Sequence, residues 1–396
     1  MVYLYKFYSE FFLWKVCTVR NFIFLLVASV VAVFIGAGCS SVNQTAAAGA
    51  AEKKVKIGLF VDSGASGNGV LHLASLIAHS PQTELVLLLA SDIRAGKLKE
   101  VDVLVMPGGG SRKQCNAIGK AHWDKVREFL RNGGGYVGTC AGMFNVLECR
   151  MKLLPFDRHL NAGGNTACVS VEITPEAAKI LDLKPGVRVV RYSGGPVAYK
   201  LENSKSEGKG IELGTYKSSV SRSKEQEGKF IGSTAWIYGT YGKGRVIATS
   251  FHPEYWESTH DMMLACFYAV SGVKMTPVFP KKNYRPVRVG ILTIGMKGRE
   301  PVETMLKLER DPDIDLDYVM SAELNQGILL HLDVLVIPEC NKDTVRKYLA
   351  AQRLTDFMNR GGSVITTGKD SAGIVPEHKN YIRLPENACI KKYIVK

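Results

Sequence analysis

Three kinds of motif are missing from this 396-residue sequence, and each absence argues against a class of chemistry. The sequence has no C-x-x-C pair, which zinc sites commonly use. It has no G-x-x-x-x-G-K loop to hold nucleotide phosphates and no recognisable nucleic-acid-binding motif. We therefore expect a protein without a metal centre, without a bound cofactor and without a nucleic-acid partner.

The nine cysteines do not suggest a disulfide framework either. Two of them, Cys17 and Cys39, fall in an N-terminal segment considered below. The other seven are odd in number and widely spaced, which is typical of small buried apolar residues rather than of paired cysteines. One alternative stays open: Cys115 lies just beyond a glycine-rich loop, and an oxidising compartment could pair it with Cys140.

Acidic residues are scarce relative to basic ones. The chain has 37 Asp and Glu against 51 Lys and Arg, a formal net charge of +14. The basic residues are scattered in short groups such as "KKNYRPVR" and "KSEGKG". Scattered charge is typical of a solvated surface, and attraction to an anionic lipid or polymer is the alternative.

The first 38 residues are predicted to be a secretion signal rather than part of the fold. A basic stretch precedes the apolar run "NFIFLLVASVVAVFIGAG", which ends at Cys39. The ending "IGAGCSS" resembles a bacterial lipoprotein signal, in which Cys39 would carry the lipid. It departs from that pattern at Gly36, where such signals usually have Leu. An uncleaved membrane anchor is the alternative.

A lipidated Cys39 implies a protein of the bacterial cell envelope that faces away from the cytoplasm. Residues 39–54 read as a flexible spacer between the membrane and the folded part. Several acyl chains, at about 0.8 kcal/mol per buried CH₂, would hold the protein firmly to the membrane.

From residue 55 onward, strand and helix patterns alternate. Short apolar runs such as "VKIGLFV", "TELVLLLA" and "VDVLVM" are separated by amphipathic stretches such as "HWDKVREFLRNGGG". This alternation predicts the α/β class, with a parallel sheet covered on both faces. We expect one domain over residues 55–275 and a Pro-rich linker over residues 276–286.

Residues 287–396 repeat the first part of that domain. "VRVGILTIG" parallels "VKIGLFVDSG", "LDVLVIPEC" parallels "VDVLVMPGG", and "LTDFMNRGGSVITTG" parallels "VREFLRNGGGYVGTC". The repeat has lost the candidate nucleophile, because Gly368 stands where the first copy has Cys140. We expect a degenerate, non-catalytic half-domain that packs on the first domain or binds a protein partner.

The segment "GTCAG", residues 138–142, predicts a nucleophile elbow with Cys140 at its tip. Small neighbours allow a sharp strand-to-helix turn and leave the sulfur open to a substrate. The following helix begins beneath the sulfur and favours its thiolate form. A buried structural cysteine after a glycine turn is the alternative for this motif alone.

Two further segments would complete a catalytic site. "SFHPEYW" places His252 and Glu254 after a predicted strand, so His252 could act as the base and Glu254 could orient its ring. "PGGGS" leaves the amides of Gly109 and Gly110 free to form an oxyanion hole with the amide of Ala141. The alternatives are a surface histidine in a proline turn and a plain glycine turn.

The order of these segments resembles the class I glutamine amidotransferase superfamily. More closely, "VDVLVMPGGGS", "GGGYVGTCAGMF", "RYSGGPV" and "YGKGRVIATSFHPE" resemble the N-terminal domain of some biotin–protein ligases. The resemblance covers about residues 55–272 and implies a flavodoxin-like three-layer sandwich. It implies Cys140 as nucleophile, His252 as base and Glu254 as orienting residue, with Tyr192, Gly194 and Gly195 bordering the pocket.

The resemblance leaves the substrate open. Nothing resembles the nucleotide loop of the biotin-ligase catalytic domain, and no synthetase domain follows to receive ammonia. One expectation is an envelope-tethered thiol amidohydrolase acting on a small-molecule or peptide-like amide. The other is a non-catalytic ligand-binding or scaffold lipoprotein that uses the same pocket.

Overall fold

The computed structural model describes residues 53–160, 162–221, 223–368, 370–384 and 390–394. The predicted signal, Cys39 and all but the last two residues of the predicted spacer lie outside the described residues. Within the described part of the chain, no helix is both long and apolar enough to cross a bilayer.

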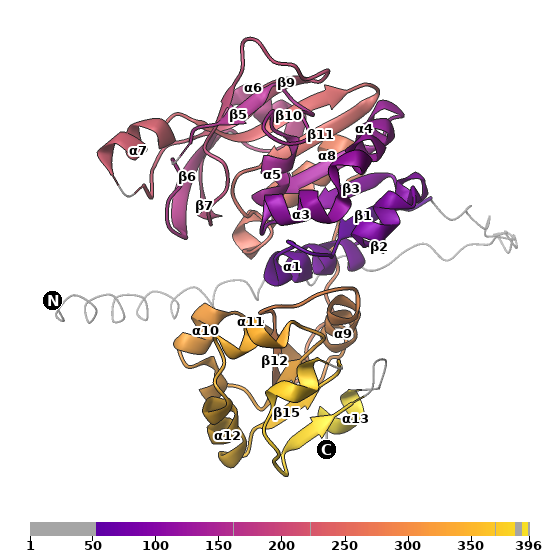
Figure 1. The fold of residues 1–396 in the computed structure, drawn as a ribbon, viewed down its shortest axis with the longest axis vertical. Coiled ribbons are helices and arrows are strands. Elements are labelled where there is room, and N and C mark those ends of the chain that lie inside the picture. The colour runs from indigo at the N-terminus through magenta and orange to yellow at the C-terminus, as the bar shows by residue number, and fades with distance from the viewer. Residues whose placement is uncertain (1–52, 161, 222, 369, 385–389, 395–396) are drawn as a thin grey trace, which may run out of the picture. The chain divides into compact units, whose positions relative to one another are not determined.

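The first domain is built on one sheet of eleven strands (Figure 1). Its parallel part has the order β2-β1-β3-β4-β11, in which each strand is a short β-branched or apolar run. The expected α/β class with a parallel central sheet is therefore confirmed. These five strands are β1 Val55–Phe60, β2 Thr83–Leu88, β3 Val103–Met106, β4 Gly135–Thr139 and β11 Gly244–Thr249.

An antiparallel extension continues the same sheet beyond β11, in the order β10-β9-β6-β7. A tight turn at Gly242 joins β10 to β11 and sets their antiparallel register. The sequence patterns did not predict this extension. Its strands are β5 Phe156–Arg158, β6 Ala167–Ile173, β7 Gly186–Tyr192, β8 Ala198–Lys200, β9 Lys209–Tyr216 and β10 Thr234–Tyr241.

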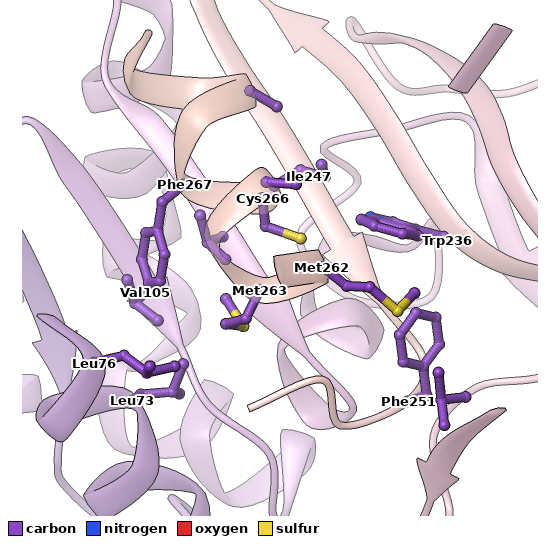
Figure 2. Close-up of a cluster of buried hydrophobic side chains, with 14 of the residues drawn as sticks. Leu73, Leu76, Val105, Trp236, Ile247, Phe251, Met262, Met263, Cys266 and Phe267 are labelled. Carbon is purple, nitrogen blue, oxygen red and sulfur yellow. The ribbon is translucent and has the colours of Figure 1, made fainter. Parts of the chain in front are cut away.

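Helices cover both faces of the parallel strands and make three layers. One face packs on α1 and α8, and the other on α2 to α5. The apolar cluster under α8 includes Met263 and Phe267, which lie beside Val105 of β3 (Figure 2). The helices are α1 Gly67–Ala78, α2 Ala90–Arg94, α3 Ser111–Ile118, α4 Trp123–Arg131, α5 Ala141–Val146, α6 Pro175–Leu181, α7 Lys224–Phe230 and α8 His260–Ser271.

The repeat forms a second, wholly parallel sheet in the order β13-β12-β14-β15-β16. This is the order of the parallel strands in the first sheet, and among the described residues of the repeat no antiparallel strands extend it. Its strands are β12 Val287–Leu292, β13 Ile314–Val319, β14 Val334–Ile337, β15 Ser363–Thr366 and β16 Tyr381–Arg383. Its helices are α9 Glu300–Glu309, α10 Ser321–Asn325, α11 Lys342–Arg346, α12 Ala351–Asn359 and α13 Lys391–Ile394.

The repeat packs on the first domain mainly through α9, which contacts α1. Val302 and Met305 of α9 belong to the same buried cluster as Leu73 and Leu76 of α1. Arg299 donates from Nε to the carbonyl oxygen of Leu87 at 3.0 Å and also pairs with Asp92. Buried apolar contacts and the Arg299–Asp92 ion pair therefore hold the repeat against the first domain.

Candidate active site

Cys140 lies on a sharp corner between β4 and α5. Its backbone has φ 50° and ψ −100°, in a region that side chains other than glycine rarely occupy. Such a conformation costs on the order of 1–3 kcal/mol and persists only where the surrounding structure enforces it. Here the Cys140 amide donates to the carbonyl oxygen of Thr249 on β11 at 2.7 Å, which extends the pairing of the two strands to the corner.

The second glycine of "GTCAG" is needed for space. A Cβ atom on Gly142 would lie 2.1 Å from the carbonyl oxygen of Met106, which is backbone and cannot move aside easily. The carbonyl oxygen of Gly142 itself accepts a hydrogen bond from the Tyr136 hydroxyl at 2.8 Å. The motif therefore brings α5 close to the end of β3, where the glycine loop begins.

His252 and Glu254 form a buried pair just after β11. The Nδ1 atom of His252 lies 2.9 Å from Oε1 of Glu254, and the two side chains are 4% and 0% exposed. The hydroxyl of Thr139 donates to the same carboxylate oxygen at 3.3 Å. Two nearby groups thus fix the carboxylate that orients the imidazole, and the other ring nitrogen remains for the sulfur.

The side chains of Cys140 and His252 both lie against Gly108 and are therefore close to each other. Burial lowers the pKa of His252, but the negative charges of Glu254 and Cys140 and their hydrogen bonds outweigh burial and raise this pKa well above its ordinary value. The sulfur also lies 3.5 Å from the carbonyl oxygen of Ser193. The arrangement therefore favours an imidazolium beside the cysteine.

Gly108, which the sequence did not single out, lies against both side chains. A Cβ atom there would lie 2.5 Å from Cε1 of His252 and 3.5 Å from Cβ of Cys140. The first glycine of "PGGG" thus leaves room for the cysteine–histidine pair. The sequence could have indicated this role of Gly108. The glycine run follows β3, and β3 lies next to β4, so the ends of both strands meet at the same edge of the sheet.

One of the three expected oxyanion donors is already engaged. The Gly110 amide donates to the carbonyl oxygen of Gly64 at 2.8 Å, so its assignment to the oxyanion hole is wrong for this structure. The sequence could not reveal this, because the acceptor comes from a loop 46 residues earlier in the chain. Ala141 begins α5, and an amide at that position has no acceptor within its helix. The Gly109 amide and the Ala141 amide remain as candidates.

A polar cluster behind the glycine loop was also missed. Nε2 of Gln114 donates to the carbonyl oxygen of Pro107 at 2.9 Å, and Nδ2 of Asn145 donates to Oε1 of Gln114 at 2.7 Å. The thiol of Cys115 lies 3.3 Å from Oδ1 of Asn145, and burial raises its pKa to about 11. Cys115 and Cys140 are both free thiols here, so the structure shows no disulfide between them.

The "YSGGP" loop packs against the end of β11 close to the site. Tyr192 is fully buried and donates from its hydroxyl to the carbonyl oxygen of Gly195 at 2.8 Å, so it supports the loop rather than facing a ligand. A Cβ atom on Gly195 would overlap the carbonyl oxygen of Ser250, 1.8 Å away. Gly194 is exposed, with φ 73°. The loop therefore lies close to β11, just before His252.

Tyr255 is a further site residue without a signal in the sequence. Its ring centroid lies 4.9 Å from that of His252, nearly perpendicular at 75°, so it packs against the imidazole. It also lies 4.9 Å from the ring of His72 on α1. Tyr255 therefore links the cysteine–histidine pair to the side of the domain that faces the repeat.

The corresponding position in the repeat is closed. Glu339 replaces Gly108 in the aligned segments, and Gly368 replaces Cys140. A Cβ atom on Gly368 would lie 1.8 Å from Oε2 of Glu339, so the glutamate fills the space where a nucleophile would stand. The Glu339 carboxylate lies 3.4 Å from the Lys297 ammonium. Both the reactive group and its pocket are absent from this part of the repeat.

No cluster of three or more His, Cys, Asp or Glu residues that could hold a metal occurs among the residues that the structure describes. The fold and the site together define an α/β domain that presents a buried Cys-His-Glu arrangement at the carboxyl ends of parallel strands.

Part of the chain is similar to known proteins. Residues 95–153, which contain both "PGGG" and "GTCAG", match the family "Biotin-protein ligase, N terminal". A biotin–protein ligase of Schizosaccharomyces pombe is 29% identical over 165 residues, covering 39% of this chain. The chain spans only 25% of the length of that relative.

Two solved structures show a weaker likeness. A glutamine amidotransferase from Thermotoga maritima is 16% identical, with a TM-score of 0.36, and the match covers 54% of this chain and 83% of that one. A glutamine amido transferase from Methylobacillus flagellatus is 11% identical, with a TM-score of 0.36, and the match covers 54% of this chain and 75% of that one.

Proposed function

We propose that the protein is a cysteine-nucleophile amidohydrolase that cleaves an amide or peptide-like bond. The observation that carries this proposal is the strained corner at Cys140, whose side chain lies with that of His252 against Gly108, while His252 pairs with the buried Glu254. Strained backbone of this kind is concentrated at functional sites. A buried carboxylate that pairs with an imidazole orients the ring for proton transfer.

The reaction follows from the positions of these groups. The Cys140 thiolate attacks the amide carbon, and the oxyanion that forms is met by the amides of Gly109 and Ala141. The His252 imidazolium protonates the amide nitrogen, the C–N bond breaks, and the amine leaves a thioester behind. His252 then takes a proton from water, the resulting hydroxide attacks the thioester, the C–S bond breaks, and the acid departs with regeneration of the Cys140 thiolate beside the His252 imidazolium.

The substrate class is a small-molecule or peptide-like amide. The names of the similar proteins mention glutamine amide transfer and biotin ligation. For this chain we propose hydrolysis, with water as the acceptor of the acyl group. The lipoprotein-type ending at Cys39 motivates a location at the outer face of a bacterial membrane.

Alkylation of the full-length chain with iodoacetamide tests the nucleophile. Mass spectrometry follows Cys140 and uses the exposed Cys149 and Cys168 as internal references. We expect Cys140 to react faster than both references at pH 6, despite its burial, and His252→Ala to abolish the difference. In parallel, ammonia release from a panel of carboxamides should disappear in Cys140→Ser. If Cys140 reacts more slowly than the references and His252→Ala changes nothing, the proposal is wrong.

A second candidate is a non-catalytic binding or scaffold protein. The observation that favours it is the closed site of the repeat, because Glu339 shows that one copy of the fold persists without a nucleophile. In that case Cys140→Ser would leave the cellular phenotype intact, whereas removal of residues 287–396, with loss of a protein partner, would abolish it.

A further inference from the structure

A cleft of about 410 Å³ lies where the repeat meets the first domain, away from the Cys140 sulfur. α1, the segment after β11 and the end of β7 line one side, and α9, β13 and α10 of the repeat line the other. Its volume falls within the range of sites for small molecules. Polar side chains from both parts line it, among them Asn68, His72, Arg191, Glu309, Asp317 and Glu323.

The first-domain wall offers one permanent positive charge, the Arg191 guanidinium. It lies 4.9 Å over the ring of Tyr255, and its Nε atom is buried without a hydrogen-bond partner. His72 adds no charge, because burial and the charges of His260 and Arg191 lower its pKa to about 3. A guanidinium stacked on an aromatic ring, with an N–H left unpaired, is a typical partner of a carboxylate.

The repeat wall offers negative charge instead. Glu309, Asp317 and Glu323 all line it. Oε1 of Glu309 accepts from the Ser75 hydroxyl at 2.8 Å, while Oε2 accepts no hydrogen bond and lies 3.6 Å from Nδ1 of His79. Oε1 of Glu309 also accepts from the Tyr318 hydroxyl at 3.2 Å, so the carboxylate is held at the repeat wall and brings negative charge there.

Two more features point to a ligand. Asn68 is 4% exposed, and its Oδ1 atom has no hydrogen-bond partner. One wall of the cleft is aromatic, because the ring of His72 packs between those of Tyr255 and Tyr318, at 4.9 and 4.8 Å. Unsatisfied buried polar atoms are costly, and a bound molecule that supplied their partners would remove that cost.

We propose that this cleft binds a zwitterionic amino acid or short peptide with an apolar side chain. Its carboxylate meets Arg191, its ammonium group faces Glu309 and Asp317, and its side chain lies against the aromatic wall that His72 forms with Tyr255 and Tyr318. Because the Tyr255 ring also packs against His252, an occupied cleft fixes one wall of the catalytic site. The binding claim itself does not depend on the proposed amidohydrolase activity.

Titration calorimetry on the full-length Cys140→Ser chain separates binding from turnover. The probes are L-phenylalanine, its amide and its N-acetyl derivative, each at millimolar concentration. The amide lacks the carboxylate and the N-acetyl form lacks the ammonium group. We expect phenylalanine to bind and each blocked form to bind at least about tenfold more weakly, a loss of about 1.4 kcal/mol.

One variant on each wall of the cleft tests whether that wall contributes to phenylalanine binding. Arg191→Gln should weaken phenylalanine binding at least about tenfold, and Glu309→Gln should do so independently. Arg188→Gln is the matched control, because Arg188 lies on the same strand but pairs with Asp261 outside the cleft. The proposal is overturned if phenylalanine gives no heat, if the free and blocked forms bind equally, or if both wall variants bind as tightly as the control.

Discussion

The chemistry depends on a charge balance around one residue, His252. Negative charge from Glu254 raises the pKa of His252 against the opposing effect of burial. Glu254→Gln removes that charge while keeping the shape of the side chain. We expect alkylation of Cys140 at neutral pH to slow by at least about tenfold, since one pKa unit is a factor of ten in protonation. A rate equal to that of the unaltered chain would contradict the assigned role of Glu254.

The same balance predicts how stability depends on pH. The folded pKa of His252 lies above the value of 6.5 for an ordinary histidine. Its contribution to the free energy of unfolding is therefore fully present below pH 6.5 and is lost as the pH rises through the folded pKa. Denaturant titrations should show the stability difference between the unaltered chain and His252→Gln shrinking as the pH rises above 6.5. A difference that grows over that range would argue against the imidazolium.

The glycine loop offers a steric test at the same scale. A Cβ atom at Gly108 would overlap Cε1 of His252, so Gly108→Ala should displace the ring and slow Cys140 alkylation. Gly110→Ala is the control within the same loop, because its Cβ atom would meet only ordinary contacts of 3.6 Å or more, with Lys113. Equal reactivity in both variants would show that the loop does not position the imidazole.

The sequence predicted the site residues that belong to recognisable motifs. It did not predict the residues that only tertiary contacts bring to the site. Cys140, His252 and Glu254 stand at strand ends, where the α/β pattern itself predicts a site. Gly110 was assigned wrongly because Gly64, its acceptor, comes from a separate loop. Tyr255 has no motif, and its place against His252 follows only from how the chain turns after β11.

At the scale of elements, the parallel strands were predictable because each is a short apolar run between helices. The antiparallel extension was not, because strands such as β6 and β7 are half-exposed and mix charged with apolar residues. Their exposed positions carry little of the hydrophobic signal on which such predictions depend.

α8 is the helix on which the parallel core depends, and Phe267 is its fully buried aromatic (Figure 2). Phe267→Ala should lower the free energy of unfolding by about 3–5 kcal/mol. The ring packs between the sheet and α1, and its removal leaves a cavity there. Phe267→Leu should cost less than about 1.5 kcal/mol, because it fills most of that space. Chemical denaturation of both variants checks the order, and equal losses would contradict this packing.

For the whole molecule, the duplication could be read from the sequence but its docking could not. Aligned segments such as "VDVLVMPGG" and "LDVLVIPEC" reveal the repeated strands. The contact surface instead depends on scattered residues of α1 and α9 whose neighbours are fixed only in three dimensions. Asn68 shows this, because its Nδ2 atom contacts Sδ of Met320 at 2.9 Å across 252 residues of chain.

Gly67 allows the two parts to approach closely and provides the test of their docking. A Cβ atom there would lie 2.4 Å from the carbonyl oxygen of Thr293 in the repeat, so Gly67→Ala should push α1 and the repeat apart. We expect faster hydrogen–deuterium exchange over α9 and a loss of about 1–3 kcal/mol in the free energy of unfolding.

Gly228→Ala is the matched control, because Gly228 lies within α7 and a Cβ atom there would meet nothing within 4 Å. Alanine favours a helix over glycine, so this control should leave exchange over α9 unchanged and should not lower stability. If Gly67→Ala behaves like Gly228→Ala, the repeat does not rest on α1. The cleft between them would then have no fixed second wall, because the acidic groups of the repeat would no longer be held opposite Arg191.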